Sequence, residues 1–132
     1  MALYTKCILA PAVPEDGIRI SVMSRHTLND GLTPNPDITD DLWGYHFKDL
    51  GPSPKLIGDY YKRGLPWEEF EPRYLEEIRK DQKATMVHFI ACLAIVRDVT
   101  LLCIEETCER CHRRLLAEEC LRVRGQVEII CR

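Results

Sequence analysis

Residues 103–120, CIEETCERCHRRLLAEEC, concentrate the side chains of this chain that are able to do chemistry. The segment holds four cysteines, one histidine and three arginines within eighteen positions. Thiolates attack electrophiles or bind metals, histidine exchanges protons near neutral pH, and arginine binds phosphates and carboxylates through a forked set of donors. The residue types therefore suggest an anion site, a nucleophilic site or a metal site.

An anion-binding pocket is the interpretation we favour, with or without catalysis. It would be formed by polar residues that follow two predicted strands, namely Ser24, Arg25, Glu105, Cys111, His112 and Arg113. Ser24, Arg25 and Arg113 are expected to hold the anion. Cys111, or Cys103 in its place, is the candidate nucleophile, and His112 or Glu105 is the candidate acid or base.

Metal binding is an alternative for the same segment. Cys103, Cys108 and Cys111 have the C-x4-C-x2-C spacing of plant-type iron–sulfur ligands, with Cys131 as a candidate fourth ligand. For zinc, the segment supplies a single C-x2-C pair, and a histidine from elsewhere in the chain would have to complete the site. A redox pair of Cys108 and Cys111 at a helix start is a further alternative.

Plain packing is the remaining alternative. Cysteine is among the residues most often buried, and Cys92, Cys103, Cys120 and Cys131 all occupy core-like positions. Arg113 and Arg114 would then only pair with glutamate on the same helix. His88, within an apolar helix, and His46, among aromatic residues, are expected to pack rather than to react.

The composition is that of an ordinary globular α/β protein, with 132 residues, 45% hydrophobic and 30% charged, and we expect a single domain over residues 1–132. A net charge of −3 argues against broad, non-specific binding of nucleic acid. No apolar run is long enough to cross a membrane, and the N-terminus lacks the features of a signal peptide. We therefore expect a cytoplasmic protein whose seven cysteines are reduced.

Four strands and four helices are expected to position these side chains. Apolar, β-prone segments predict strands over residues 3–9, 18–24, 99–105 and 126–132. Helices are predicted after the Ser53 cap, from Pro72 onward, over 83–98 as a fully buried helix, and over 111–124. The order indicates an α/β fold with a mainly parallel central sheet of about four or more strands, flanked by helices and covered on both faces.

The expected sheet explains why the pocket residues should meet. In open α/β sheets, ligands bind beyond the carboxyl ends of the strands. The segments that begin at Ser24 and at Glu105 both leave strands at that edge. The helix that starts near Cys111 would add the positive end of its dipole, which favours an anion and ionisation of a thiol. Aromatic residues between 43 and 74 are expected mainly in the core, although some could stack on a base or sugar.

Several motifs together resemble the domain of unknown function 488 family. They are ISVMSR, LWGYHFKDLGPSPKL, WEEFEPRYLEE, VTLLCIE and CHRRLLAE, spread over residues 18–120. The resemblance implies a small α/β domain without an assigned activity. It places the family signature on Ser24, Arg25, Trp43, Pro52, Ser53, Trp67, Phe70, Tyr74, Cys103, Glu105, Cys111, His112 and Arg113. Relatives carry proline or a polar residue at the position of Cys108, which argues against mechanisms that need this cysteine.

These inferences leave the activity open. The expected ligand is a phosphate-bearing or nucleotide-like molecule, and no cofactor is predicted. Catalysis on that ligand and recognition of nucleic acid or of a partner's phosphate without turnover both fit the sequence. The oligomeric state is not specified by any motif.

Overall fold

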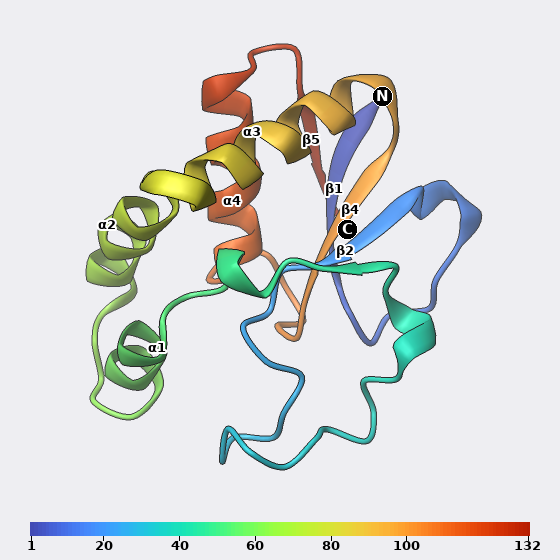
Figure 1. The fold of residues 1–132 in the computed structure, drawn as a ribbon. Helices are drawn as coiled ribbons and strands as arrows, with labels where there is room; N and C mark the ends of the chain where they lie inside the picture. The colour runs from blue at the N-terminus through green and yellow to red at the C-terminus, as the bar shows by residue number, and fades with distance from the viewer.

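The computed structural model describes residues 1–132 and contains a five-stranded sheet (Figure 1). Its strands are β1 (Ala2–Cys7), β2 (Ile18–Ser21), β3 (Tyr45–His46), β4 (Val99–Cys103) and β5 (Glu128–Cys131). They lie in the order β3-β2-β4-β1-β5, and every neighbouring pair is parallel. The predicted α/β fold with a parallel sheet is therefore confirmed, with β3 as a strand that the sequence did not predict.

Four helices accompany the sheet. They are α1 (Pro54–Tyr61), α2 (Trp67–Ile78), α3 (Asp81–Val96) and α4 (His112–Val123). The connections from β3 to β4 and from β4 to β5 both move in the same direction across the sheet. Because parallel crossovers are right-handed, both place their helices on one face, as Figure 1 shows. The connection from β1 to β2 moves the opposite way and covers the other face.

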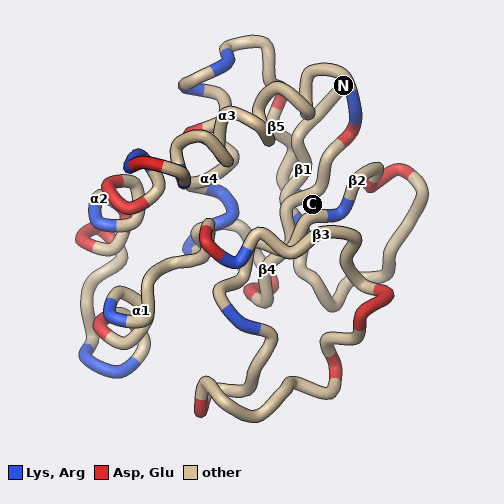
Figure 2. Tube along the Cα trace, in the orientation of Figure 1, with Lys and Arg blue, Asp and Glu red and all other residues tan.

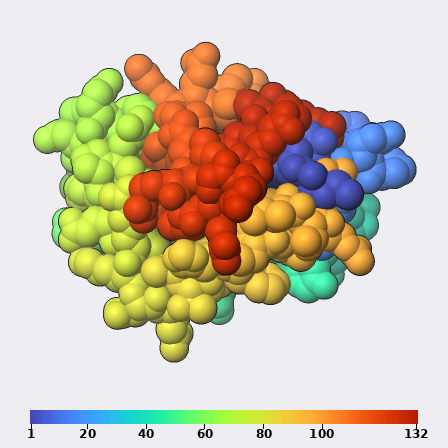
Figure 3. All heavy atoms as spheres, turned by 90° about the horizontal axis from the view of Figure 1, so that it is seen from above, coloured from blue at the N-terminus to red at the C-terminus, as the bar shows by residue number.

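The main core lies between the helices and the sheet. Leu3, Ile20 and Leu101 are fully buried there and pack with side chains of α2, α3 and α4. The view in Figure 3 shows the C-terminal segment lying beside the first residues of the chain. This agrees with the parallel pairing of β5 to β1. The strands thus carry one continuous apolar face, which fixes their register.

The opposite face of the sheet is covered by connecting segments rather than by the four α-helices, so both faces are covered, as expected. Part of this cover is a polar cluster. Asp16 lies there, in a short turn between β1 and β2, and is fully buried. Its carboxylate pairs with Lys6 at 3.0 Å, Arg19 at 2.6 Å and Arg132 at 3.4 Å. Its backbone carbonyl accepts the hydroxyl of Thr100 at 2.7 Å. The whole of β4 is buried, because this turn covers Thr100 and a second apolar cluster, in which Leu102 packs with Ile8 and Ile38, covers the rest of this face.

Two helices differ from the prediction in ways that the packing explains. Ser53 caps α1 as expected, and its hydroxyl accepts the backbone N–H of Leu56 at 3.2 Å. Helix α2, however, begins at Trp67, so that Pro72 lies inside it. Proline removes one helical hydrogen bond, from the carbonyl of Glu68, and this exposed residue can be solvated instead.

Helix α3 was predicted to be buried all round, and this is wrong. One face, including Val87 and Ile90, enters the core. The other face leaves Phe89 54% and Val96 65% exposed, and His88 is exposed with them. The buried face of a helix is recognised in a sequence by an amphipathic pattern. Because the sequence of α3 is apolar on all sides, it does not show which face is buried. None of the helices has both the length and the apolar character needed to cross a bilayer.

A disulfide joins Cys108, in the connection between β4 and α4, to Cys131 of β5. The expectation that all seven cysteines are reduced is therefore not met, and Cys131 is exposed rather than part of the core. Cys92 is exposed as well, whereas Cys103, Cys111 and Cys120 are buried as free thiols. The disulfide fixes the segment that leads into α4 against the edge of the sheet.

Candidate functional site

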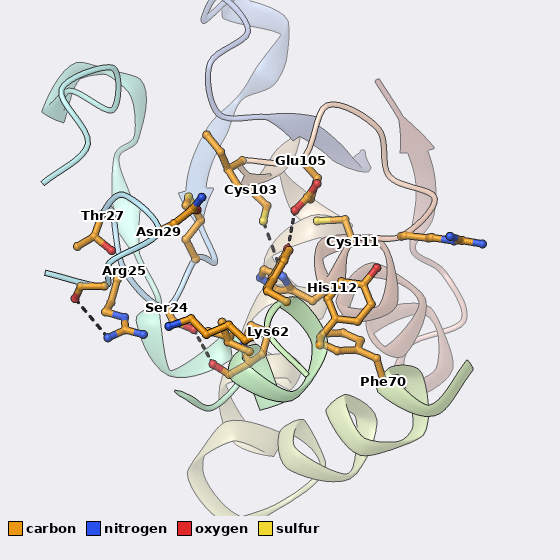
Figure 4. A pocket seen from close by; sticks show the side chains of 18 of the residues that line it. Ser24, Arg25, Thr27, Asn29, Lys62, Phe70, Cys103, Glu105, Cys111 and His112 are labelled. Atoms are coloured by element: carbon orange, nitrogen blue, oxygen red, sulfur yellow. Dashed lines mark hydrogen bonds between the residues drawn. The ribbon is translucent and has the colours of Figure 1, made fainter. Parts of the chain in front are cut away.

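A pocket of about 430 Å³ lies at the carboxyl ends of β2 and β4 (Figure 4). Its walls come from the segments that follow these two strands, from the start of α4, and from α1 and α2. The pocket is where the strand-end rule predicted it. Five of the six expected residues line it, namely Ser24, Arg25, Glu105, Cys111 and His112. Arg113 does not, although it follows His112 directly.

Two thiols and an imidazole meet on one side of this pocket. Cys103 is the last residue of β4, Cys111 caps α4 and His112 begins it. The Sγ atoms and a ring nitrogen of these residues all lie within 4.8 Å of one another. Their exposed fractions are 4%, 2% and 8%, so the cluster is shielded from bulk water but borders the pocket. Figure 4 shows Cys103 facing His112, with Cys111 beside them.

The orientation of His112 fixes which of its nitrogens faces the thiols. Nε2 lies 2.7 Å from the carbonyl oxygen of Val22. A carbonyl only accepts hydrogen bonds, so Nε2 carries a proton and donates it. In the neutral ring, Nδ1 then holds a lone pair, and it lies 3.7 Å from the Sγ of Cys103. His112 is therefore set to accept a proton from Cys103 or to bind an electrophile beside it.

Arg113 is fully buried behind the cluster. Its Nη1 donates to the carbonyl oxygen of Glu105 at 2.7 Å and lies 3.4 Å from the Sγ of Cys111. Its Nε and Nη2 have no hydrogen-bond partner, and no carboxylate pairs with it. The expectation that Arg113 grips an anion inside the pocket is not met in this arrangement. A buried cation without a carboxylate needs another anion nearby, and the thiols are the groups able to supply it.

The two thiols ionise differently because they share a hydrogen bond. The pKa of Cys103 is lowered, first by the hydrogen bond from Cys111, then by a backbone N–H at Glu105 and by the charge of Arg113. The pKa of Cys111 is raised well above its usual value because it keeps the proton of that shared bond and is buried. The pair thus favours one thiolate on Cys103, opposite the lone pair of His112.

Glu105 lies at the pocket edge, two residues after Cys103. One oxygen of its carboxylate accepts the hydroxyl of Tyr61 at 2.5 Å, which links the end of β4 to the end of α1. The carboxylate is partly exposed and forms no ion pair. It can therefore still exchange a proton with a molecule bound in the pocket.

Ser24 lines the pocket, but its hydroxyl is already engaged. It donates to the carbonyl oxygen of Pro52 at 2.6 Å and so holds the segment that leads into α1. Gly51 makes this contact possible, because a Cβ there would lie 2.3 Å from the Oγ of Ser24. Ser24 positions a wall of the pocket, and it would have to release Pro52 to donate to a ligand.

The rim of the pocket is basic. Arg25, Lys62 and Arg110 line it and are exposed, and none of them forms an ion pair. Glu105 is the one acidic residue among the lining side chains. In Figure 2, the end of α1 and the start of the connection after β2 are basic on the same side of the molecule. The rim of the pocket therefore carries excess positive charge although the whole chain is acidic.

Aromatic side chains form another wall. Tyr60, Trp67 and Phe70 line the pocket, and Trp67 stacks on Phe70 with ring centroids 5.0 Å apart. Trp67 and Phe70 are also part of the main core. The expectation of core packing is thus confirmed for these two rings, while their free faces remain next to the pocket.

Two polar residues in the segment after β2, His26 and Asp30, have structural roles. His26 does not line this pocket; its Nε2 lies 2.7 Å from the Oγ of Ser21, and its ring stacks on His46 at 4.0 Å. Burial, together with the charge of His46, lowers the pKa of His26 to about 4. Asp30 accepts the backbone N–H groups of Leu32 and Thr33, which closes its own loop.

The sequence interpretation missed Lys62, Arg110 and Tyr61. Tyr61 is the last residue of α1 and Lys62 follows it, and no local pattern shows that this helix end reaches β4. The signal that was available is the lack of an acidic residue in the YYKRG segment at the end of the helix. The Cys108–Cys131 disulfide removes both cysteines from the proposed iron–sulfur set and from a Cys108–Cys111 redox pair.

The fold and site define a small α/β protein with a thiol–imidazole cluster at the border of a basic-rimmed pocket at its strand ends. Residues 3–125 match the family model DUF488-N3a, described as the active DUF488-N3 subclade. The chain therefore belongs to the domain of unknown function 488 family, as its motifs predicted. No curated protein and no solved structure matches it.

Proposed function

We propose that this protein is an enzyme that acts on a phosphate-bearing, nucleotide-like ligand bound in the pocket at the strand ends. The observation that carries the proposal is the cluster of Cys103, Cys111 and His112 at the border of a pocket with a basic rim. A binding module needs the rim alone. Buried reactive groups that open onto the same pocket are what an enzyme requires.

The pocket suits a ligand with an anionic part and a flat apolar part. Its volume of about 430 Å³ lies in the range of small-molecule sites. Arg25 and Lys62 offer unpaired positive charge for a phosphate, and the rings of Tyr60 and Trp67 offer a surface for a base. A basic rim beside an aromatic wall therefore suits a nucleotide-like ligand, which has a phosphate and a flat base.

The cluster offers defined chemical roles. The lowered pKa of Cys103 favours its thiolate over that of Cys111, and Nδ1 of His112, 3.7 Å from the Sγ of Cys103, offers a lone pair for a proton beside it. Glu105 is the second acid or base, and it approaches the pocket from the end of the same strand. Arg113 acts from behind the cluster and Cys111 acts from beside Cys103, since the hydrogen bond from Cys111 and the charge of Arg113 both lower the pKa of Cys103.

Binding of nucleotides by calorimetry, followed by product analysis after long incubation, tests the proposal. Arg25→Ala and Lys62→Ala should each weaken binding about tenfold, the loss of one charge-assisted contact. Arg97→Ala is the matched control, because Arg97 is exposed and lies at the opposite edge of the sheet, ahead of β4.

Cys103→Ser should retain binding and abolish turnover. Binding that never leads to product in the unaltered chain would instead support recognition of nucleic acid or of a partner's phosphate without catalysis. If no nucleotide binds and the rim variants behave as the control does, the proposal is wrong.

A further inference from the structure

We propose that Cys103 Sγ, Cys111 Sγ and His112 Nδ1 are three ligands of a zinc ion whose fourth position opens onto the pocket. This inference rests on the proposed function and specifies how the cluster acts on a ligand. It assigns the thiolates to a metal ion rather than to direct attack on the substrate. Zinc takes thiolate and imidazole ligands in tetrahedral sites.

The three donor atoms are spaced as a tetrahedral site requires. With bonds of about 2.3 Å to sulfur and about 2.0 Å to nitrogen, the edges of a zinc tetrahedron are roughly 3.5–3.8 Å. The Sγ of Cys103 lies 3.7 Å from Nδ1 of His112. No pair of the three atoms is more than 4.8 Å apart. The remaining edges therefore exceed those of a zinc tetrahedron by about 1 Å at most, and the ligand side chains would move together by that amount when the ion binds.

The surroundings of the imidazole are those of a metal ligand. A metal-binding histidine usually donates its other ring N–H to a carbonyl or a carboxylate, which fixes the ring and its tautomer. The hydrogen bond from Nε2 to the Val22 carbonyl, at 2.7 Å, does this here. The lone pair on Nδ1 therefore already faces the two sulfur atoms.

The number of ligands indicates a reactive site rather than a structural one. Structural zinc sites have four protein ligands, whereas catalytic sites have three and leave one position for water or substrate. None of the other cysteines joins this set: Cys108 and Cys131 are bonded to each other, Cys120 faces the carbonyl of Val87, and Cys92 is exposed on α3. Cys7 lies beside Cys103 in the sheet, but its Sγ contacts the carbonyl oxygen of Ile104 at 3.4 Å. Glu105 is held by Tyr61 and remains beside the site as an acid or base.

Arg113 gives the fourth position a charge preference. Two thiolates neutralise the two positive charges of the ion, and any proton still on either sulfur passes to solvent when the metal binds. The charge of Arg113, 3.4 Å from the Sγ of Cys111, is then unbalanced. An anionic oxygen at the fourth position, from hydroxide or from a phosphate-bearing substrate, restores neutrality. The buried cation without a carboxylate thus has a role in the loaded site.

Cobalt substitution is the direct test. The full chain is treated with a chelator and a phosphine reductant and is then titrated with cobalt(II) chloride. We expect one equivalent of cobalt to give thiolate charge-transfer absorption and the intense visible bands of tetrahedral coordination, and zinc chloride to displace it. The absence of these bands in the unaltered chain would overturn the proposal.

Variants assign the bands to the three residues. Cys103→Ser, Cys111→Ser and His112→Gln should each lose or shift them, whereas Cys92→Ser and His88→Gln, which alter exposed residues of α3, should not. A chain with both Cys108→Ser and Cys131→Ser should keep the bands, which separates the site from thiols released by the reductant. Bands that survive in Cys103→Ser and Cys111→Ser, or vanish in the double variant, contradict the proposal.

A second measurement holds even where a variant fails to fold. In the unaltered chain, zinc should protect Cys103 and Cys111 from alkylation while Cys92 stays reactive, as peptide mass spectrometry would show. Equal labelling with and without zinc rejects the metal site. Nucleotide binding measured in chelator is a separate readout: if it persists without any cobalt bands, the metal inference fails and the proposed function stands.

Discussion

Two buried charged side chains, Asp16 and Arg113, differ in whether the protein supplies them with a paired residue of opposite charge. On one face of the sheet, the carboxylate of Asp16 is surrounded by Lys6, Arg19 and Arg132 and accepts the backbone N–H of Val13. Burial alone would raise the pKa of Asp16, but these hydrogen bonds lower it. Beside the pocket, the guanidinium of Arg113 has no carboxylate, and two of its nitrogens have no partner.

The difference separates a charge that holds the fold from one that is available to a ligand. The carboxylate of Asp16 is fully engaged by these donors, and Arg19, although its Nη2 has no hydrogen-bond partner, is paired with that carboxylate. The Asp16 cluster therefore joins the first turn to the sheet, whereas Arg113 has no paired carboxylate. Arg113 keeps unused donors next to ionisable thiols, and a polar group left unsatisfied in a native structure calls for a functional explanation. Four predictions test this contrast.

Loss of the charge of Asp16, which is paired with three basic residues, should have the largest effect on stability. Asp16→Asn leaves Lys6 and Arg19 buried without a counter-charge, and we expect a loss of about 3–5 kcal/mol in the free energy of unfolding. Urea denaturation measures it. Glu76→Gln, which breaks an exposed pair with Lys80, is the control and should change stability by less than about 1 kcal/mol. Similar losses in the two variants would remove the basis of the contrast.

The disulfide between Cys108 and Cys131 tests whether the two regions are independent. Cys131 precedes Arg132, which pairs with Asp16, and Cys108 lies in the connection that carries the pocket residues. The bond closes a sequence separation of 23 residues, so its reduction should lower stability by about 3 kcal/mol in the chain-entropy estimate. Thermal melting with and without reductant measures this.

Cys131→Ser should match the reduced chain, and reductant should then have no further effect. A larger fall in stability, approaching that of Asp16→Asn, would mean that the disulfide also maintains the Asp16 cluster.

Glu119 of α4 is a second buried carboxylate that is paired with arginines. It tests whether such pairing also stabilises the fold away from Asp16. Burial alone would raise its pKa, but hydrogen bonds from Arg122 and Arg79 lower it to about 2. A carboxylate whose pKa is lower in the folded than in the unfolded chain stabilises the fold at pH values above its unfolded pKa, near 4.3. This stabilisation is lost as the pH falls through the folded pKa. We expect Glu119→Gln to cost about 2 kcal/mol at pH 7.

The stability difference between Glu119→Gln and the unaltered chain should narrow between about pH 5 and pH 2. Urea unfolding at a series of pH values measures it. A difference that stays constant over this range would show that the charge of Glu119 is not the cause.

Replacement of Arg113, which has no paired carboxylate, should have the smallest effect on stability. Arg113→Met exchanges a buried, partly unsatisfied guanidinium for an apolar chain, and we expect a change within about 1 kcal/mol. In chelator-treated protein, the pH midpoint for alkylation of Cys103 should move upward, because a nearby positive charge that lowers the pKa of this thiol is lost. Alkylation rates against pH measure it. A loss as large as that of Asp16→Asn would make Arg113 a structural residue.

The fold was largely predictable because it rests on local patterns. Strong apolar segments marked four of the five strands, and the Ser53-Pro54 pair marked the start of α1. Strand β3, Tyr45–His46, is too short to give an alternating pattern. The exposed face of α3 was missed because Phe89 and Val96 are as apolar as the residues that it buries.

The site was predictable in part because parallel strands end at one edge. That rule brought Ser24 and Arg25 to the same pocket as Glu105, Cys111 and His112. The same rule did not show that the side chain of Arg113 would be buried. The position of a residue near the start of a helix does not indicate whether its side chain is buried or exposed. Cys103 was expected in the core, and it is buried, yet its position at the last residue of β4 also places it on the pocket border.

The Cys108–Cys131 bond has a consequence for how the chain can be cut. It closes a covalent ring that contains all of α4 and the turn before β5. A protease that cleaves one peptide bond within residues 109–130 leaves two pieces that remain attached until a reductant is added. Reducing and non-reducing gels of the same digest should therefore differ for cuts inside the ring and agree for cuts elsewhere.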